Sequence, residues 1–81
     1  MTKLKALLEK FNISVPEMAE QSKDYPFATV VLSKQFLYPI VSGKKKNLFI
    51  STVLHMLWTL NKITGKNFKP NDIIEYEEIL K

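Results

Sequence analysis

The sequence predicts a small all-α domain, and three observations support this fold class. Apolar residues recur at helical spacing over residues 3–11 and again over 48–64. Residues that commonly begin helices stand before several of the predicted helical stretches, and a glycine stands directly after two of these stretches. The one β-branched stretch, 27–32, has no clear second strand to pair with. At 81 residues, with 46% apolar and 25% charged residues, the chain is typical of a single globular domain over 1–81.

The first of these stretches has one apolar face, as a surface helix does. Its apolar residues lie at i, i+3, i+4 and i+7: Leu4, Leu7, Leu8 and Phe11. Thr2 stands before them as an N-cap. A second helix start follows at Ser14, where Glu17 three residues later completes a capping box and Pro16 fits the first turn. This second helix is brief and ends near residues 21–22.

Residues 22–32 are predicted to be irregular or a short helix, and the next segment admits two interpretations. In the first, Ser33 caps a helix over 33–42. Pro39 then lies inside the helix, where a proline removes a backbone hydrogen bond and costs about 3 kcal/mol. In the second, a helix over 26–38 stops because of Pro39. Proline chemistry slightly favours the second interpretation.

The longest helical pattern covers residues 48–64 and ends at Gly65, which suits a C-cap. Its predicted buried stripe follows the 3.6-residue period: Ile50, Val53, Leu54, Leu57, Leu60 or Asn61, and Ile63 or Thr64. Apolar residues off this stripe and at the C-terminus form a candidate dimer interface: Phe49, Met56, Trp58, Ile79 and Leu80. A final helix is predicted from Pro70, with Asp72 in its first turn. Residues 76–81 either extend it or form an acidic C-terminal arm.

Charge is segregated along the chain. The net charge of +4 arises from 12 basic residues, all of them lysine, and 8 acidic residues. Residues 1–24 carry four lysines and four acids, whereas residues 25–71 carry seven lysines and no acid. Residues 72–81 carry four acids and one lysine. A central segment of one sign is typical of a surface that binds a polyanion.

Residue types that most enzymes need are scarce in this chain. It has no cysteine, a single histidine (His55) and only two glycines, and its acids gather near the two ends. We therefore expect no catalytic activity, no metal and no cofactor. No stretch approaches the roughly 20 apolar residues of a membrane-spanning helix, and no signal peptide is evident. The expectation is a soluble cytoplasmic protein without membrane contact.

Basic, amide and aromatic residues are interleaved around residue 40. If residues 33–42 are helical, Lys34, Gln35 and Tyr38 share one outward edge. A lysine loop follows, consisting of Lys44, Lys45, Lys46 and Asn47. Glutamine can bond an adenine edge in two places, lysine can reach guanine acceptors, and tyrosine can contact a phosphate or a thymine methyl. The loop would hold phosphates and set the register, so these residues predict a surface for double-stranded DNA.

Three motifs stand in a familiar order along the chain. They are Ile13-Ser14-x-x-Glu17-x-Ala19, Ser33-Lys34-x-x-Leu37-x-x-Ile40-x-Ser42-Gly43-Lys44 and Pro70-x-Asp72-Ile73-Ile74-Glu75-Tyr76. With the helix at 3–11 and the long fourth helix, they resemble the Cro/cI-like (XRE-type, lambda-repressor-like) helix-turn-helix family. The closest pattern is a short bacterial or phage member with an insertion before the recognition helix.

The resemblance implies a five-helix domain that binds DNA through its third helix, usually as a homodimer. It implies that Lys34, Gln35 and Tyr38 face the bases, and that Ser42 to Lys46 approach the backbone. The expected function is a small transcriptional regulator that binds duplex DNA through residues 33–47. The alternative is a protein-binding adaptor or antitoxin-like module that keeps the helix-turn-helix core without reading an operator. Such a module would use the acidic arm and the candidate interface residues for its protein partner.

Overall fold

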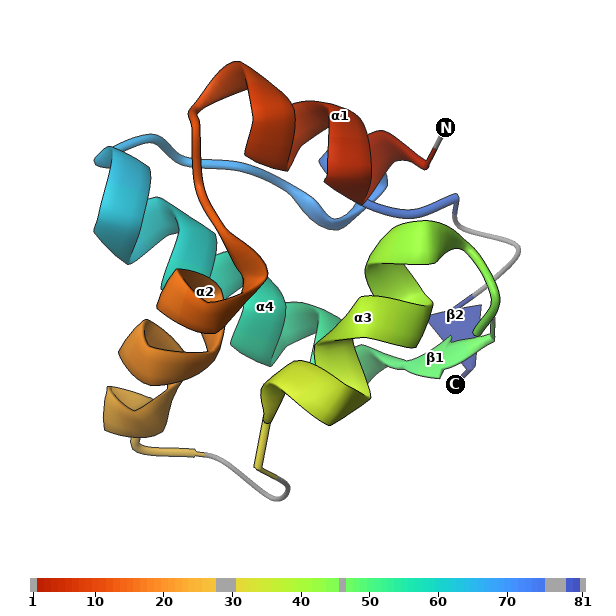
Figure 1. Cartoon of the computed structure of the whole chain (residues 1–81). Coiled ribbons are helices and arrows are strands. Elements are labelled where there is room, and N and C mark those ends of the chain that lie inside the picture. The colour runs from red at the N-terminus through yellow and green to blue at the C-terminus, as the bar shows by residue number, and fades with distance from the viewer. Residues whose placement is uncertain (1, 28–30, 46, 76–78, 81) are drawn as a thin grey trace.

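The residues that the structure describes form four α-helices, two 3₁₀ turns and two very short strands (Figure 1). The computed structural model describes residues 2–27, 31–45 and 47–75, together with the backbone of residues 79–80. The elements in chain order are α1 Lys3–Lys10, α2 Val15–Gln21, η1 Ser22–Asp24, α3 Lys34–Ser42, β1 Leu48–Phe49, α4 Ile50–Thr64, η2 Pro70–Asp72 and β2 Ile79–Leu80. The chain is thus mostly helical, in agreement with an all-α class.

The predicted N-caps Thr2 and Ser14 are confirmed, but the hydrogen bonds of the described residues do not include the return bond from the Ser14 N–H to the Glu17 side chain that the predicted capping box requires. The hydroxyl oxygen of Thr2 accepts a hydrogen bond from the N–H of Lys5 at 3.0 Å, and that of Ser14 accepts one from Glu17 at 3.2 Å. Each cap satisfies an N–H group that a helix start leaves without an internal partner. The buried residues of α1 are the predicted Leu4, Leu7 and Leu8.

α3 follows the first interpretation of its segment, so the prediction of a helix over 26–38 is wrong. Ser33 caps the helix by accepting a hydrogen bond from the N–H of Phe36 at 3.2 Å, and Pro39 lies inside it. The carbonyl that the proline leaves without a helical donor belongs to Gln35, which is exposed. Water can therefore satisfy this carbonyl, and the cost of the proline falls below that of a buried position.

α4 begins at Ile50, two residues after the predicted start, and its buried face is rotated from the predicted stripe. Its buried residues are Thr52, Val53, His55, Met56, Leu57, Thr59 and Leu60. Leu54, predicted to be buried, is 45% exposed. Met56, predicted to lie in a dimer interface, is 1% exposed, so that assignment is wrong. Polar residues are buried here because they find partners: the hydroxyl of Thr59 donates to the carbonyl of His55 at 2.9 Å.

The chain after α4 forms no fifth α-helix in the residues described. Gly65 ends α4 with a φ of 71°, as predicted for a C-cap. Pro70–Asp72 is a single 3₁₀ turn, which the Asp72 carboxylate stabilises by accepting the N–H of Lys69 at 2.8 Å. The next residues, Ile73 and Ile74, are both buried.

The end of the chain returns to the middle of the sequence as a strand. Ile79 and Leu80 of β2 pair in parallel with Leu48 and Phe49 of β1. This pairing replaces the predicted helical extension at these two residues. Residues 76–78 and 81 lie outside the described residues, as do the side chains of Ile79 and Leu80. The acidic arm and the interface role of these two side chains therefore stay predictions.

The core lies between α4 and the other helices, and the segment after α4 runs back alongside α1 (Figure 1). Phe68 of this segment packs edge-on against Phe11, with 5.7 Å between ring centroids. Lys3 at the start of α1 donates to the carbonyl of Asn71 at 2.8 Å and pairs with Glu75 at 3.2 Å. The most deeply buried large residues are Leu4, Met18, Leu32, Leu37, Val53, Met56 and Leu60. This packing leaves one side of α3 facing solvent.

Candidate nucleic-acid interface

α3 presents a polar face to solvent over its whole length. Its exposed residues are Lys34, Gln35, Tyr38 and Ser42. Because successive residues of an α-helix turn by about 100°, these four share one side. Leu37, Ile40 and Val41 are buried on the opposite side. The outward edge predicted for a helix over 33–42 is therefore present, and Tyr38 is 52% exposed rather than a core aromatic.

The lysine loop starts at the end of α3 and is tied to the carbonyl of Pro39. The N–H groups of Lys44 and Lys45 both donate to this oxygen, at 2.9 and 3.0 Å. The N–H of Gly43 donates to the carbonyl of Ile40 at 3.2 Å, which completes a Schellman motif. The side chains of both lysines are exposed. The first half of the loop thus has a defined backbone that carries two solvent-facing lysines.

The second half of the loop turns the chain into β1. Asn47 is exposed and has a φ of 59°, a left-handed conformation that asparagine tolerates better than most residues. Lys46 lies outside the described residues. We refer to the exposed residues of α3 and the loop together as the basic face: Lys34, Gln35, Tyr38, Ser42, Lys44, Lys45 and Asn47.

The start of α1 supports the end of α3. The hydroxyl of Thr2 donates to the carbonyl of Val41 at 2.8 Å while it accepts the N–H of Lys5. Gly43 has a φ of 85°, and a Cβ added there would lie 3.0 Å from the Cγ2 methyl of Thr2. The left-handed backbone conformation favours glycine here, and the close approach to Thr2 adds to that preference. This packing of Thr2 on Gly43 fixes the point from which the lysine loop departs.

The positive charge of the basic face has no acidic partner within the described residues. Ion pairs in that part of the chain join Lys3 to Glu75, Lys23 to Glu20, and Lys62 to Asp24. None of them involves Lys34, Lys44 or Lys45, and the sequence has no acid between residues 25 and 71. These lysines are thus free to interact with an external anion, as phosphate contacts require.

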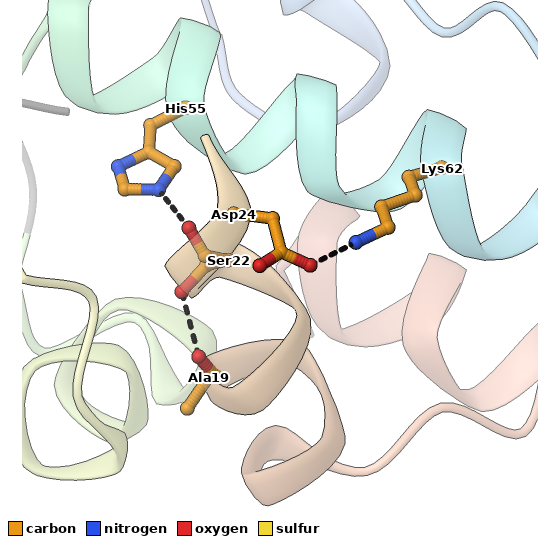
Figure 2. Close-up of polar contacts among 5 residues, drawn as sticks. All are labelled: Ala19, Ser22, Asp24, His55 and Lys62. Atoms are coloured by element: carbon orange, nitrogen blue, oxygen red, sulfur yellow. Dashed lines mark hydrogen bonds and ion pairs between the residues drawn. The ribbon is translucent and has the colours of Figure 1, made fainter. Parts of the chain in front are cut away.

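The chain between α2 and α3 is anchored on α4 (Figure 2). His55, only 3% exposed, donates from Nε2 to the carbonyl oxygen of Ser22 at 2.8 Å. The hydroxyl of Ser22 donates in turn to the carbonyl of Ala19 at 2.7 Å. Nearby, Lys62 pairs with the carboxylate of Asp24 at 2.6 Å. His55 is therefore a buried structural histidine, satisfied by a backbone carbonyl.

Aromatic packing extends this anchor. The ring of Tyr25 stacks on His55, with 4.5 Å between centroids, and lies 5.4 Å from Trp58. The ammonium of Lys62 lies 5.2 Å from the Trp58 ring. The hydrogen bond from Lys62, and then its charge, hold the pKa of Asp24 below the ordinary value of 3.8. Trp58, predicted as an interface residue, is half-buried in this cluster.

Exposed apolar side chains gather at the start of α4. Phe49, named in the candidate dimer interface, is 63% exposed, and Ile50 next to it and Leu54 five positions further on are also exposed. Ile50 and Leu54 lie one helical turn apart, so they share a side of α4. We refer to these three residues as the apolar patch. Sequence periodicity assigned the last two to the core because it cannot distinguish between two apolar faces of one helix.

The described residues hold no group of three or more histidines, aspartates and glutamates that could bind a metal ion. No helix in the same part of the chain is long and apolar enough to cross a membrane. Comparison with protein-family models, with curated proteins and with solved structures found no match. A functional proposal therefore depends on the fold and on the basic face.

Proposed function

We propose that this chain is a small transcriptional regulator that binds duplex DNA through its basic face, as a homodimer. The observation that supports this best is the continuity of the exposed side of α3 with Lys44 and Lys45. No acidic residue interrupts positions 25 to 71. A surface of one sign attracts the phosphate backbone, and such contacts supply most of the affinity of a DNA-binding protein.

The geometry of α3 supports base contacts at one end of the basic face and phosphate contacts at the other. α3 is a helix of 9 residues, and an α-helix with its side chains is about 10–12 Å across, which fits the roughly 12 Å width of the major groove. Lys34, Gln35 and Tyr38 would contact base edges from its N-terminal half. Lys44 and Lys45, at its C-terminal end, would bind phosphates and set the register. Because every basic residue is lysine, we expect phosphate contacts to contribute more than bidentate base contacts.

Salt dependence of duplex binding tests this proposal. Changing Lys44, Lys45 and Lys46 to Ala should weaken binding to all sequences alike, and should reduce the log–log salt slope by about 0.9 for each phosphate that is no longer neutralised. Gln35→Ala should instead reduce the preference at one base position, by about 1–3 kcal/mol. Fluorescence anisotropy with a selected duplex and a random duplex measures both effects.

A matched control removes the same charge elsewhere, by changing Lys5, Lys66 and Lys69 to Ala. This control should retain more affinity and more of the salt slope than the loop variant. Absence of duplex binding at low salt would refute the proposal. Equal weakening by the control and the loop variant would show that net charge, rather than the basic face, causes binding.

A second candidate function is a protein-binding adaptor or antitoxin-like module. The apolar patch favours it, because it places three exposed apolar side chains within six residues, and clusters of exposed apolar side chains commonly mark a protein interface. An antitoxin-like module would use both the patch and the basic face. A chain that lacks duplex binding but depends on Phe49 and Leu54 for association would support the adaptor.

A further inference from the structure

Two large apolar side chains are exposed in the segment that leads into α3. Phe27 is 76% exposed and Val31 is 75% exposed, more than any other large apolar residue in the part of the chain that the structure describes. Val31 stands two positions before Ser33, the N-cap of α3, and residues 31–33 run directly into that helix (Figure 1). Neither side chain belongs to the apolar patch at the start of α4, so they form a separate exposed apolar feature.

Both side chains project from backbone that their neighbours hold in place. The ring of Phe27 packs edge-on against Tyr25, with 5.9 Å between ring centroids, and Tyr25 stacks on the buried His55. Next to Val31, Leu32 is only 1% exposed, which fixes the chain to the core. Residues that are held in this way lose less conformational entropy when they contact a partner.

The charged groups around this segment favour a polyanion as the partner. The lysine and the aspartate that directly precede it are each paired within the chain. Lys34, which follows it, makes none of the ion pairs found among the described residues, and no acid occurs between residues 25 and 71. Phe27 and Val31 thus lie in the same stretch of one charge sign as the basic face, and a surface of this sign attracts DNA.

The proposed DNA contact of α3 brings this segment to the major groove. Val31 stands three positions before Lys34, so their Cα atoms lie at most about 11 Å apart. This distance corresponds to about three base pairs at a rise of about 3.4 Å each. With Lys34 and Gln35 on base edges, Val31 lies within about three base pairs of them. Phe27 follows four positions further from the helix.

The major groove offers an apolar side chain one kind of apolar partner. Thymine presents its C5-methyl group there, whereas the other base edges present hydrogen-bond donors and acceptors. An apolar side chain that covers a donor or acceptor without bonding it leaves that group unsatisfied, at a cost in affinity. Contact with a methyl group instead buries apolar surface on both partners. Exposed apolar side chains in this groove therefore select for thymine.

We infer that Phe27 and Val31 are specificity-determining residues that contact thymine methyl groups beside the base pairs contacted by α3. This inference rests on the proposed function. It assigns thymine to one or two positions next to those contacted by Lys34 and Gln35. The two side chains discriminate between bases without hydrogen bonds, which adds sequence preference to a surface whose lysines contribute mainly phosphate contacts.

Deoxyuridine in place of thymine tests this inference on the full chain, because it lacks only the 5-methyl group. A duplex is first selected from a random pool with the wild-type protein, and each of its thymines is then replaced singly. At one or two positions, deoxyuridine should lower wild-type affinity about fourfold, as expected for one buried methyl group. Fluorescence anisotropy measures the affinity of each duplex.

Phe27→Ser and Val31→Ser should each remove the methyl dependence at one of these positions, so that thymine and deoxyuridine bind alike there. Phe27→Leu and Val31→Ile keep an apolar side chain, and these matched controls should retain the dependence. All four changes are at exposed side chains, so the variants should fold. Sedimentation equilibrium should give each variant the oligomeric state of the wild type.

Wild-type affinity that ignores every deoxyuridine replacement would overturn the inference while the proposed function stands, because duplex binding itself is then intact. A methyl dependence that persists in both serine variants would also overturn it, since another side chain such as Tyr38 would then make the contact. Serine variants that lose the wild-type oligomeric state would instead place Phe27 and Val31 between copies of the chain. Absence of duplex binding by the wild type refutes the proposed function, and this inference with it.

Discussion

At the scale of single residues, the side chains that anchor the segment before α3 on α4 have a structural role. His55 reaches the carbonyl of Ser22, 33 positions earlier in the chain, and Lys62 reaches Asp24, 38 positions earlier. A buried carbonyl without a donor costs about 1–3 kcal/mol. The only histidine of the chain is thus accounted for by a structural hydrogen bond.

Lowering the pH should break the pair between Asp24 and Lys62, and the direction follows from the pKa of Asp24. Lys62 holds this pKa below 3.8 in the folded chain, so folding favours the deprotonated carboxylate. The resulting contribution to stability is present above about pH 4 and is lost as the pH falls through the lowered pKa. An NMR titration of the Asp24 carboxyl should therefore give a midpoint below 3.8 in wild type.

Lys62→Met should return this midpoint to about its ordinary value, because it removes both the hydrogen bond and the charge. Lys66→Met removes the same charge from an exposed loop and should leave the midpoint in place. A midpoint unaffected by Lys62→Met would contradict the cause assigned to the shift.

At the scale of elements, α3 forms because its two caps and its buried side chains stabilise the helix more than Pro39 destabilises it. Ser33 caps the start and Gly43 the end, and an N-cap alone is worth about 1 kcal/mol. Its buried apolar residues are Leu37, Ile40 and Val41, and full burial of each such side chain contributes about 1.5–3 kcal/mol. The roughly 3 kcal/mol cost of an interior proline is smaller than this sum.

Pro39→Ala should raise the free energy of unfolding by about 1–2 kcal/mol. Alanine restores the N–H that can donate to the carbonyl of Gln35 and removes the ring that crowds it. Part of the gain is offset because alanine makes the unfolded chain more flexible. Urea denaturation measures the change. Gln35→Ala, on the exposed side of the same helix, is the control and should stay within about 0.5 kcal/mol of wild type. A loss of stability in Pro39→Ala would show that the ring packs against an essential neighbour.

At the scale of the whole molecule, the basic face and the apolar patch are joined by a short connection. Asn47, at the end of the first, and Phe49, at the start of the second, are separated by Leu48 alone. If two copies associate through the patch, both lysine loops lie close to the interface. A homodimer with two basic faces on one assembly fits a DNA site with two half-sites.

Sedimentation equilibrium should show a dimer that depends on the apolar patch. Changing Phe49 and Leu54 together to Ser should give a monomer without loss of folding, since both side chains are exposed. The matched control changes Phe27 and Val31, which are also exposed, to Ser and should remain dimeric. A wild-type chain that is monomeric at all concentrations would exclude the homodimer and leave a different protein as the partner of the patch.

The structural features that were predictable from the sequence are those that depend on residues close together in the chain. The caps at Thr2, Ser14 and Gly65 act within four residues of their helix ends, so a short stretch is enough to specify them. The exposed edge of α3 was also predictable, because polar and apolar residues separate cleanly on a helix over 33–42. For α3 itself, the slight preference for a helix over 26–38 was wrong, since it weighed Pro39 without the burial that compensates for it.

Tertiary packing decided the rest. The sequence of α4 is apolar on several sides, and packing against the neighbouring elements places Met56 in the core and leaves Leu54 exposed. The segment after η2 buries Ile73 and Ile74. The strand β2 then pairs with β1, whose residues lie 31 positions earlier in the sequence. The hollow lined by the starts of α1 and β1, the end of α3, α4 and residues 73–75 likewise exists only where distant segments meet. Local propensity acts over a few residues, whereas burial, strand pairing and cavities depend on partners that are remote in the chain.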